Sequence, residues 1–513
     1  MTTAALIILT MAIPLATAVI SLAVRNQPNL RDSVTLAGAV ALFICVLTVL
    51  ANFNMGLPFD FELIEFQPGI AIAFHVEPLG MVFALVASSL WILTHIYGIG
   101  YMRGNNEKNH ARFFACFAVA LFATMGIAFS ANLLTLFLFY EVLTVSTYPL
   151  VAHKENAEAK AGARTYIGIL MGTSIVLLLT GIIWTYVITG TMDFSPGGIL
   201  AGKVEDGFVP VLLGLFAFGI GKAALMPFHR WLPAAMVAPT PVSALLHAVA
   251  VVKAGVFSIL KVGVYVFGID NLAATGASVW LMWLAAFSIL VASLVAMQQD
   301  NLKRRLAYST ISQLSYITLG VALATSMGAI GGGLHIVTHA FGKITLFMCA
   351  GAIYVATHKT EISQMRGLGR KMPFTFIAFG IGALSIIGIP PLAGSWSKWL
   401  LVLGSADAAQ VRSMLGDPSW PQLIMIGVLM VSSLLNIAYL IPVFARGFYG
   451  SHRDVAPEGG WRAAIQEAPL FCVLPSCITA FGCLVLFFYA GDIAGFLEPM
   501  TAAIPASTNG EGQ

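Results

Sequence analysis

Residues 132–151 read NLLTLFLFYEVLTVSTYPLV, an apolar run in which Glu141 is the only charged side chain. A run of about 20 apolar residues is the length that a helix needs to cross the hydrocarbon core of a bilayer. Glu141 lies about ten residues from each end, which places it near the middle of such a helix. A charge at that depth is costly, so an ionisable residue within a membrane is by default a candidate functional residue.

The composition extends this interpretation to the whole chain. Of the 513 residues, 58% are hydrophobic and only 10% are charged, which is typical of a polytopic helical membrane protein. The net charge of +3 is small and the basic residues are scattered, so we expect no nucleic-acid partner. The six cysteines lie in apolar segments without metal-ligand spacing, so we expect neither a metal nor a disulfide. The sequence contains no nucleotide, flavin or iron–sulfur motif, and we expect no cofactor.

Apolar stretches of spanning length predict fourteen transmembrane segments. The first is long enough to span and lacks a basic leader, so we interpret it as a helix and not as a signal peptide. The predicted segments are residues 4–24, 33–53, 77–100, 111–129, 131–151, 163–189, 208–228, 240–267, 276–298, 306–325, 328–356, 373–403, 420–446 and 468–491.

The distribution of basic residues supports this number of segments. When the loops are numbered alternately, most of the 26 Lys and Arg residues fall on one side, and only Lys203 and Arg412 fall on the other. Cytoplasmic loops carry the excess of basic residues, so we expect both termini outside, in the cytoplasmic membrane of a bacterium. The outer loops carry acidic residues, including Glu62 and Glu65, in a stretch to which the sequence assigns no role.

Two of the predicted segments are interrupted in the same way. The seventh reads GLFAFGIGKAALMPFHRWLPAAM (214–236), with glycines before Lys222 and a proline after it. The twelfth reads SIIGIPPLAGSWSKWL (385–400), with two prolines and a glycine before Lys398. Non-helical backbone at membrane depth persists only where protein buries it or it lines a wet cavity. We therefore expect Lys398 to face a hydrated cavity and to exchange a proton there with the outside or with a neighbouring subunit.

Interrupted helices at corresponding places in two halves indicate a transporter built from repeats. The pattern predicts an all-α polytopic membrane protein with two five-helix repeats, segments four to eight and nine to thirteen. Because five is odd, the second repeat is inverted relative to the first. The repeats cover residues 111–268 and 276–447, whereas residues 1–110 hold the first three helices and residues 448–513 hold the last helix and a C-terminal tail.

Five cationic side chains also lie inside the apolar segments, and all are lysine: Lys222, Lys253, Lys261, Lys343 and Lys398. Lysine gives up its proton readily when it is desolvated, whereas arginine stays charged. Buried lysines therefore favour proton transfer, although a purely structural clamp between Glu141 and a lysine is the alternative. Lys261 lies about 12 Å beyond Lys253 toward the outer face, where a long side chain can reach the interface, so for Lys261 we favour a structural role.

His335, His339 and Lys343 follow one another at four-residue spacing, so they share one helical face. Two histidines four residues apart could bind a metal, but no third ligand and no HExxH glutamate accompany them. We therefore adopt a hydrogen-bonded proton relay as the interpretation. His247, six residues before Lys253, either belongs to this relay or is an ordinary core histidine.

Five stretches together resemble one known family, the proton-conducting antiporter-like subunits shared by respiratory complex I and Mrp-type multisubunit cation/proton antiporters. They are NLLTLFLFYEVLTVSTYPLV (132–151), GKAALMPFHRWLPAAMVAPTPVSALLHAVAVVKAGVF (221–257), DNLKRRLAYSTISQLSYITLG (300–320), HIVTHAFGKITLF (335–347) and PPLAGSWSKW (390–399). The resemblance implies a fourteen-helix core in which Glu141 pairs with Lys222. It also implies that Lys253 and the face of His335, His339 and Lys343 link two half-channels, with Lys398 as the terminal lysine.

Within this family the chain looks most like the D-type members of Mrp antiporters, because it stops soon after the fourteenth segment and the twelfth-segment break carries a lysine. The implied function is proton translocation within a Na⁺/H⁺ antiporter, an ion transporter and not an enzyme. The expected partners are other membrane subunits, protons, Na⁺ and the lipid bilayer. The alternative is a membrane-arm subunit of a complex I-like oxidoreductase or of a membrane-bound hydrogenase, and a carbon-uptake complex of the same fold is a further one. The buried charges disfavour a non-transporting scaffold.

Overall fold

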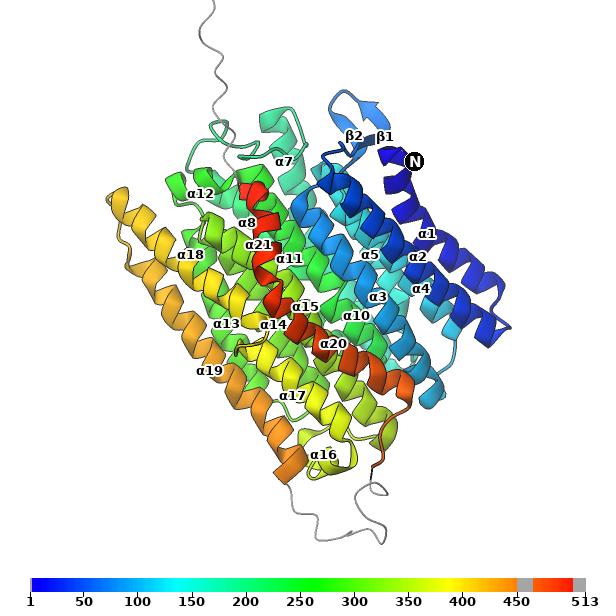
Figure 1. The fold of residues 1–513 in the computed structure, drawn as a ribbon. Helices are drawn as coiled ribbons and strands as arrows, with labels where there is room; N and C mark the ends of the chain where they lie inside the picture. Colours follow the sequence, from blue (N-terminus) through cyan, green and yellow to red (C-terminus); the bar gives the residue numbers. More distant parts are fainter. Residues whose placement is uncertain (1, 450–464, 502–513) are drawn as a thin grey trace, which may run out of the picture.

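The computed structural model of the protein describes residues 2–449 and 465–501. The chain forms a bundle of long helices with a small β-hairpin at one end (Figure 1). The side chains of residues 246–248 are outside the description, so the predicted role of His247 falls outside the described residues.

The N-terminal part consists of three helices and the hairpin. These elements are α1 (Thr3–Ala23), α2 (Pro28–Asn54), β1 (Asp60–Gln67), β2 (Ile70–His75) and α3 (Pro78–Gly104).

The hairpin is an addition to the predicted helical fold, and it lies in the acidic stretch that contains Glu62 and Glu65, to which the sequence assigned no role. β1 and β2 pair antiparallel around a turn at Pro68 and Gly69. Proline presets the first turn position, and Gly69 supplies the positive φ of +80° that the second requires. β2 leads directly to Glu77, the residue before α3.

The first predicted repeat extends from α4 to η4. Its elements are α4 (His110–Ala128), α5 (Leu133–Val151), α6 (Ala157–Thr173), η1 (Ser174–Leu178), α7 (Leu179–Thr189), α8 (Val209–Gly219), η2 (Gly221–Ala223), α9 (Trp231–Ala234), η3 (Ala235–Val237), α10 (Thr240–Ala248), α11 (Val251–Val262) and η4 (Gly263–Phe267). The seventh predicted segment is the broken run from α8 to η3. The eighth is also interrupted, between α10 and α11, and the sequence did not predict this second break.

The second predicted repeat follows the short helix α12 (Ile269–Thr275). Its elements are α13 (Val279–Gln298), α14 (Leu302–Ala322), α15 (Ser326–Thr357), η5 (Ile362–Gln364), α16 (Leu368–Lys371), α17 (Pro373–Ile387), α18 (Gly394–Met414) and α19 (Trp420–Tyr449). α20 (Leu470–Phe488), α21 (Ala490–Leu497) and η6 (Glu498–Thr501) complete the described chain. The twelfth predicted segment is the broken pair α17 and α18.

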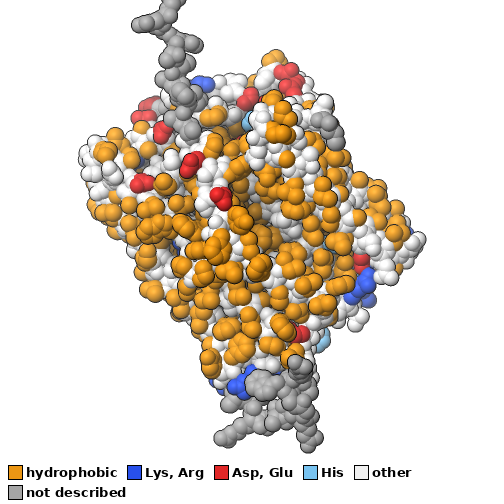
Figure 2. Space-filling view, in the orientation of Figure 1, with side chains coloured by type: hydrophobic (Ala, Val, Ile, Leu, Met, Phe, Trp, Pro, Cys, Tyr) orange, Lys and Arg blue, Asp and Glu red, His pale blue; other side chains and the backbone are white. Residues whose placement is uncertain are grey.

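The predicted polytopic membrane fold is confirmed. Ten helices in the described ranges are long and apolar enough to cross a membrane, or eleven when the bent pair Val251–Phe267 and Ile269–Thr275 counts as one span. The other three predicted segments coincide with α8–η3, with α17–α18 and with the polar helix α14. Figure 2 shows a broad hydrophobic surface between the two ends of the bundle, with most of the visible acidic side chains at the hairpin end.

Two equivalent contacts at opposite ends of the bundle support the inverted repeat. Asn132 follows α4, forms a β-bridge with Asp193, and its side chain caps α5. Asn301 follows α13, forms a β-bridge with Glu361, and its side chain caps α14. The first contact lies beside the hairpin, since Ser130 also bridges to β2, whereas the second lies at the end that carries α16 (Figure 1). α4 and α13 therefore run in opposite directions.

At each of the two predicted breaks, a side chain donates a hydrogen bond to a backbone carbonyl oxygen. In the seventh segment, Trp231 Nε1 donates a hydrogen bond to the carbonyl oxygen of Gly221 at 2.9 Å. In the twelfth, α17 ends at Gly388, whose φ is +92°, and Lys398 Nζ donates to the carbonyl oxygen of Ile387 at 2.9 Å. Broken backbone at membrane depth requires such partners.

Candidate functional site

The face predicted on α15 is buried in the centre of the molecule. His335, His339 and Lys343 are each at most 2% exposed. Lys253 Nζ on α11 lies 2.7 Å from His339 Nδ1, so this contact joins the first repeat to the second. When Lys253 carries its proton, Nζ can only donate, so Nδ1 then accepts and the ring hydrogen of neutral His339 lies on Nε2.

Lys343 begins a directional chain of hydrogen bonds. Its Nζ donates to Ser309 Oγ at 2.7 Å, and Ser309 Oγ lies 2.8 Å from the hydroxyl of Tyr439. The Tyr439 hydroxyl donates to Asn436 Oδ1. Each hydroxyl accepts one hydrogen bond and donates the next, so the chain connects α15 through α14 to α19.

His335 connects α15 to the broken twelfth segment. Its Nδ1 lies 2.8 Å from Ser397 Oγ, one residue before Lys398. Its ring stacks on Tyr316 with the centroids 5.5 Å apart, and Lys398 Nζ lies 5.1 Å from the centroid of the same tyrosine ring. Lys398 also donates to Ser433 Oγ on α19 at 3.1 Å. The predicted residues of the second repeat therefore form one polar cluster.

Lys398 lines a cavity of about 660 Å³ between α18 and α19. The other lining residues are mostly apolar, and Trp399 and Leu434 are 54% and 65% exposed on the flank of the bundle. The cavity therefore opens on the side of the bundle, at membrane depth. Its lining is mostly apolar, in contrast to the hydrated cavity that the sequence predicted around Lys398.

The structure places Lys222 differently from the ion pair implied with Glu141. Lys222 Nζ donates to the carbonyl oxygen of Tyr140 at 2.8 Å and to Thr144 Oγ1 at 2.6 Å. Tyr140 and Thr144 are four residues apart on one face of α5, whereas Glu141 points about 100° away from Tyr140. Both carboxylate oxygens of Glu141 are buried and make no hydrogen bond with any residue that the structure describes. The two groups are electrostatic neighbours without direct contact.

Gln313 is a candidate that sequence reasoning missed. The contacts of Ser309 with Lys343 and of Tyr316 with His335 set an antiparallel register between α14 and α15. Gln313 lies between these two contacts on the same side of α14. Its amide oxygen and nitrogen are buried and have no hydrogen-bond partner within the described chain. Buried amides are normally bonded, so this position suits an ordered water beside the cluster.

Lys261 corrects our prediction of a side chain that extends to the interface. It is 1% exposed and turns inward, with Nζ 2.8 Å from Glu77 Oε1. Sequence reasoning also missed Glu77, because it is the first residue of the third predicted segment and was not counted as a charge within the membrane. The position of Glu77 at the edge of an apolar run was the signal that could have identified it as a charge near the membrane interior.

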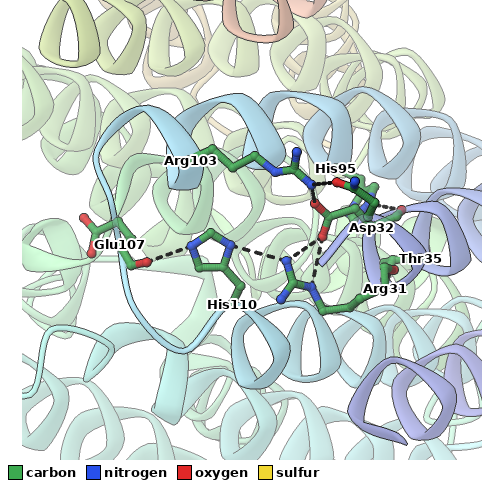
Figure 3. A network of polar contacts seen from close by, with 8 residues as sticks. Arg31, Asp32, Thr35, His95, Arg103, Glu107 and His110 are labelled. Atoms are coloured by element: carbon green, nitrogen blue, oxygen red, sulfur yellow. Dashed lines mark hydrogen bonds and ion pairs between the residues drawn. The ribbon is translucent and has the colours of Figure 1, made fainter. Parts of the chain in front are cut away.

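Figure 3 shows a second polar network, where α2 and α4 begin and α3 ends. Asp32 Oδ1 accepts from Arg31 Nη2 at 2.7 Å, and Asp32 Oδ2 accepts from Arg103 Nη2 at 2.5 Å. His95 Nε2 lies 3.0 Å from the main-chain oxygen of Asp32, and His110 Nδ1 lies 3.4 Å from Arg31. In the sequence, Arg31 and Arg103 are among the loop cations of the more basic side, whereas in the structure Arg31 and Asp32 are only 4% and 5% exposed.

The fold and these contacts define a polytopic membrane protein with a buried row of lysines and histidines through two inverted helical units. The family model described as NADH:quinone oxidoreductase/Mrp antiporter, TM matches residues 130–416, more than half of the chain, and the chain belongs to this family. A second model, described as NADH-Ubiquinone oxidoreductase (complex I), chain 5 N-terminus, matches residues 66–114.

Similar curated proteins are named as subunits of NADH-quinone or NAD(P)H-quinone oxidoreductases. The chain is 30% identical over 503 residues to NADH-quinone oxidoreductase subunit N of Desulforudis audaxviator, covering 96% of this chain and 97% of that protein. It is 32% identical over 346 residues to NAD(P)H-quinone oxidoreductase chain 5 of Synechocystis sp., a match that covers 64% of this chain and 49% of that protein.

Two solved structures share the fold. A chain of the Mrp complex from Dietzia sp. DQ12-45-1b superposes with a TM-score of 0.82 and 22% identity, covering 98% of this chain and 97% of that one. A chain of the membrane-bound sulfane sulfur reductase, an archaeal respiratory membrane complex, superposes with a TM-score of 0.80 and 24% identity, covering 97% and 98%.

Proposed function

We propose that the chain is a proton-translocating membrane subunit of a multisubunit monovalent cation/proton antiporter, of the D type in Mrp complexes. In this proposal protons move through Glu141, Lys222, His247, Lys253, His335, His339, Lys343 and Lys398. The complex exchanges them for Na⁺ across a bacterial cytoplasmic membrane, with both termini of this chain outside. Other membrane subunits surround the chain, in keeping with the multisubunit complexes that contain its structural neighbours.

The contact between Lys253 and His339 carries this proposal. A lysine ammonium that donates to a neutral imidazole nitrogen at 2.7 Å can pass its proton along that bond. The N–H bond of lysine breaks, the Nδ1–H bond of histidine forms, and the positive charge moves from α11 to α15. Neither group has a carboxylate partner among the described residues to hold the charge in place.

The use of lysine throughout the row fits this role better than a structural one. Lys222, Lys253, Lys343 and Lys398 all bond to neutral oxygen or nitrogen acceptors and not to carboxylates. Neutral partners leave each ammonium free to lose its proton, whereas a carboxylate would stabilise the charged form. The absence of arginine from the row agrees with the same requirement.

A second candidate function has support from the named relatives. The curated proteins that match this chain are named as quinone oxidoreductase subunits, so a membrane-arm subunit of a redox-driven pump is the alternative. The same proton path serves both functions, and the difference lies in the partner subunits.

Exchange in membrane vesicles tests the proposal. Vesicles that contain the complex should dissipate a preformed ΔpH when NaCl is added, and Lys253→Met should abolish this response in a complex of normal assembly on native gels. The exposed Lys203→Gln is the matched control and should behave as wild type. Wild-type exchange in the assembled Lys253→Met complex contradicts the proton path. Iron–sulfur clusters in the purified complex, with a ΔpH driven by an electron donor and no response to NaCl, would favour the redox alternative.

A further inference from the structure

The ion pair between Glu77 and Lys261 is buried near the hairpin end of the bundle. The two side chains are 8% and 1% exposed, and Lys261 Nζ also donates to the carbonyl oxygen of Ser130 at 2.7 Å. The rings of Phe194 and Phe257 flank the ammonium, with centroids 4.7 and 5.5 Å away. The pair joins α3 to α11 beside the turn between α4 and α5.

This pair lines a cavity of about 920 Å³ that reaches the surface. Glu77, Lys261 and Tyr265 are on its wall, and Asp60 and His75 of the hairpin are at its rim. At the rim, His75 Nδ1 lies 2.7 Å from Asp60 Oδ1, and these side chains are 50% and 72% exposed, so the cavity is open to solvent.

The charged and titratable groups on this cavity come from several elements. The hairpin contributes Asp60 and His75, the loop before α8 contributes Asp193, and η4 contributes Tyr265. Acidic groups outnumber basic ones around Lys261, which favours the entry of cations, protons included.

The same helix connects this cavity to the central row. Lys261 lies eight residues after Lys253 on α11, which is about 12 Å along the helix. Lys253 contacts His339, whereas Lys261 contacts Glu77. One helix thus carries one lysine of the central cluster and one lysine on the wall of a cavity that reaches the surface.

Stability alone does not account for the pair. Replacing a buried ion pair by well-packed apolar residues is often neutral or stabilising, because burying two charges costs desolvation energy. Ionisable residues within membranes instead mark ion paths. The position of this pair, with one side in protein and the other on an open cavity, suits exchange of protons with water.

We propose that Glu77 and Lys261 form the site at which protons pass between the central row and the outer solution. The Lys261 ammonium gives a proton to the Glu77 carboxylate: the N–H bond breaks, the O–H bond forms, and the pair becomes neutral. Glu77 then releases this proton to water in the cavity, and Lys261 takes another from the side of Lys253. This inference rests on the proposed function and adds an outer exit that lies away from Lys398.

Neutral substitutions of both partners separate this role from a structural one. Glu77→Gln with Lys261→Met removes both charges together, so neither is left buried alone. In an assembled complex we expect exchange to fall at least roughly tenfold, as for loss of a proton-transferring group. Asp270→Asn, an exposed acidic residue outside this cavity, is the matched control and should keep wild-type exchange. Exchange within twofold of wild type in the assembled double variant overturns the proposal.

Chemical labelling tests the open side of the site independently. Glu77→Cys, in a background without the six native cysteines, should react with a charged methanethiosulfonate reagent added from the outside only. Labelling from the inside only, or no labelling, overturns the assignment. Lys253→Met, measured in parallel, distinguishes failure of the proposed outer exit from failure of the proposed proton path. If it abolishes exchange while the Glu77/Lys261 variant keeps it, only the outer exit is wrong; if both keep exchange, the proton path itself is wrong.

Discussion

Nζ of Lys253 lies 2.7 Å from Nδ1 of His339, and this hydrogen bond joins a helix of the first repeat to a helix of the second. Beyond this contact, His335 connects to Ser397 at the broken twelfth segment, and Lys343 connects through Ser309 toward α19. Through the contact between Lys253 and His339, a buried lysine of the first repeat is therefore joined to the polar cluster of the second.

Lys253→Met should abolish exchange, and Lys253→Arg should also lose it. Methionine keeps a long unbranched side chain without an ionisable group, and arginine keeps the charge but does not release its proton. We expect a loss of at least roughly tenfold for both variants, since proton-transferring groups contribute on the order of 100-fold or more. ΔpH-driven exchange in vesicles measures the effect. Ser258→Ala, buried on the same helix, is the matched control, and activity in Lys253→Arg would show that only the charge matters.

Glu141→Ala and Lys222→Ala should each abolish exchange while assembly persists. The acid and the base make no direct ion pair: Lys222 is held by Tyr140 and Thr144, so removing Glu141 leaves the lysine's hydrogen bonds intact. We therefore expect a functional loss without a folding defect, visible as normal migration on native gels together with absent exchange. A Glu141→Ala complex that fails to assemble would instead favour the structural clamp.

Much of this architecture was predictable because its determinants are local in the chain. Apolar length predicts the helices, and four-residue spacing predicts that His335, His339 and Lys343 share a face of α15. The glycines and prolines around Lys222 and Lys398 predict the two breaks. These features depend only on neighbours along one helix, and the structure has them where the sequence placed them.

The partners of these residues were not predictable, because they come from distant helices and have ordinary side chains. Ser309 is 34 residues from Lys343, and Ser397 is 62 residues from His335. A hydroxyl within a helix usually bonds its own backbone, so it gives no signal of such a contact. The partnership of Glu77 with Lys261 was not predictable because the two residues come from distant parts of the chain, next to α3 and on α11. The hairpin was not predicted because β1 has no buried face, so its sequence lacks a clear alternation of apolar and polar residues.

Lys343→Arg should lose exchange although it preserves the charge. Lys343 Nζ lies 2.7 Å from Ser309 Oγ inside a fully buried site, where the larger guanidinium meets crowding and keeps its proton. The expected loss is again at least roughly tenfold in the vesicle assay. Ser309→Ala tests the chain of hydroxyls that follows, and we expect a smaller reduction there because a water can replace a hydroxyl. Near wild-type exchange in Lys343→Arg would mean that this lysine only balances charge.

Asp32→Asn should destabilise the N-terminal helices without touching the proton path. Asp32 lies between Arg31 and Arg103 in the network of Figure 3, so the substitution leaves the buried charge of Arg31 without its carboxylate. Breaking a buried pair in this way costs about 3–5 kcal/mol. Thermal unfolding of the detergent-solubilised chain measures the loss. Asp417→Asn breaks the more exposed pair with Arg412 and should cost less than about 1 kcal/mol, so equal effects would contradict the role of burial.

A cysteine in place of Lys398 should be protected by the assembled complex. The cavity beside Lys398 opens on the flank of the bundle between α18 and α19, and exposed apolar side chains such as Trp399 and Leu434 surround it. A large exposed apolar patch marks a lipid or protein contact, and under the proposed function a neighbouring subunit is the expected cover. In a background without native cysteines, we expect Lys398→Cys to react quickly with a small permeant maleimide in the isolated chain and at least roughly tenfold more slowly in the complex. Met414→Cys, 74% exposed at the far end of α18, should react in both states. Rapid reaction of Lys398→Cys in the complex with a charged reagent added from outside would instead place an aqueous exit at Lys398.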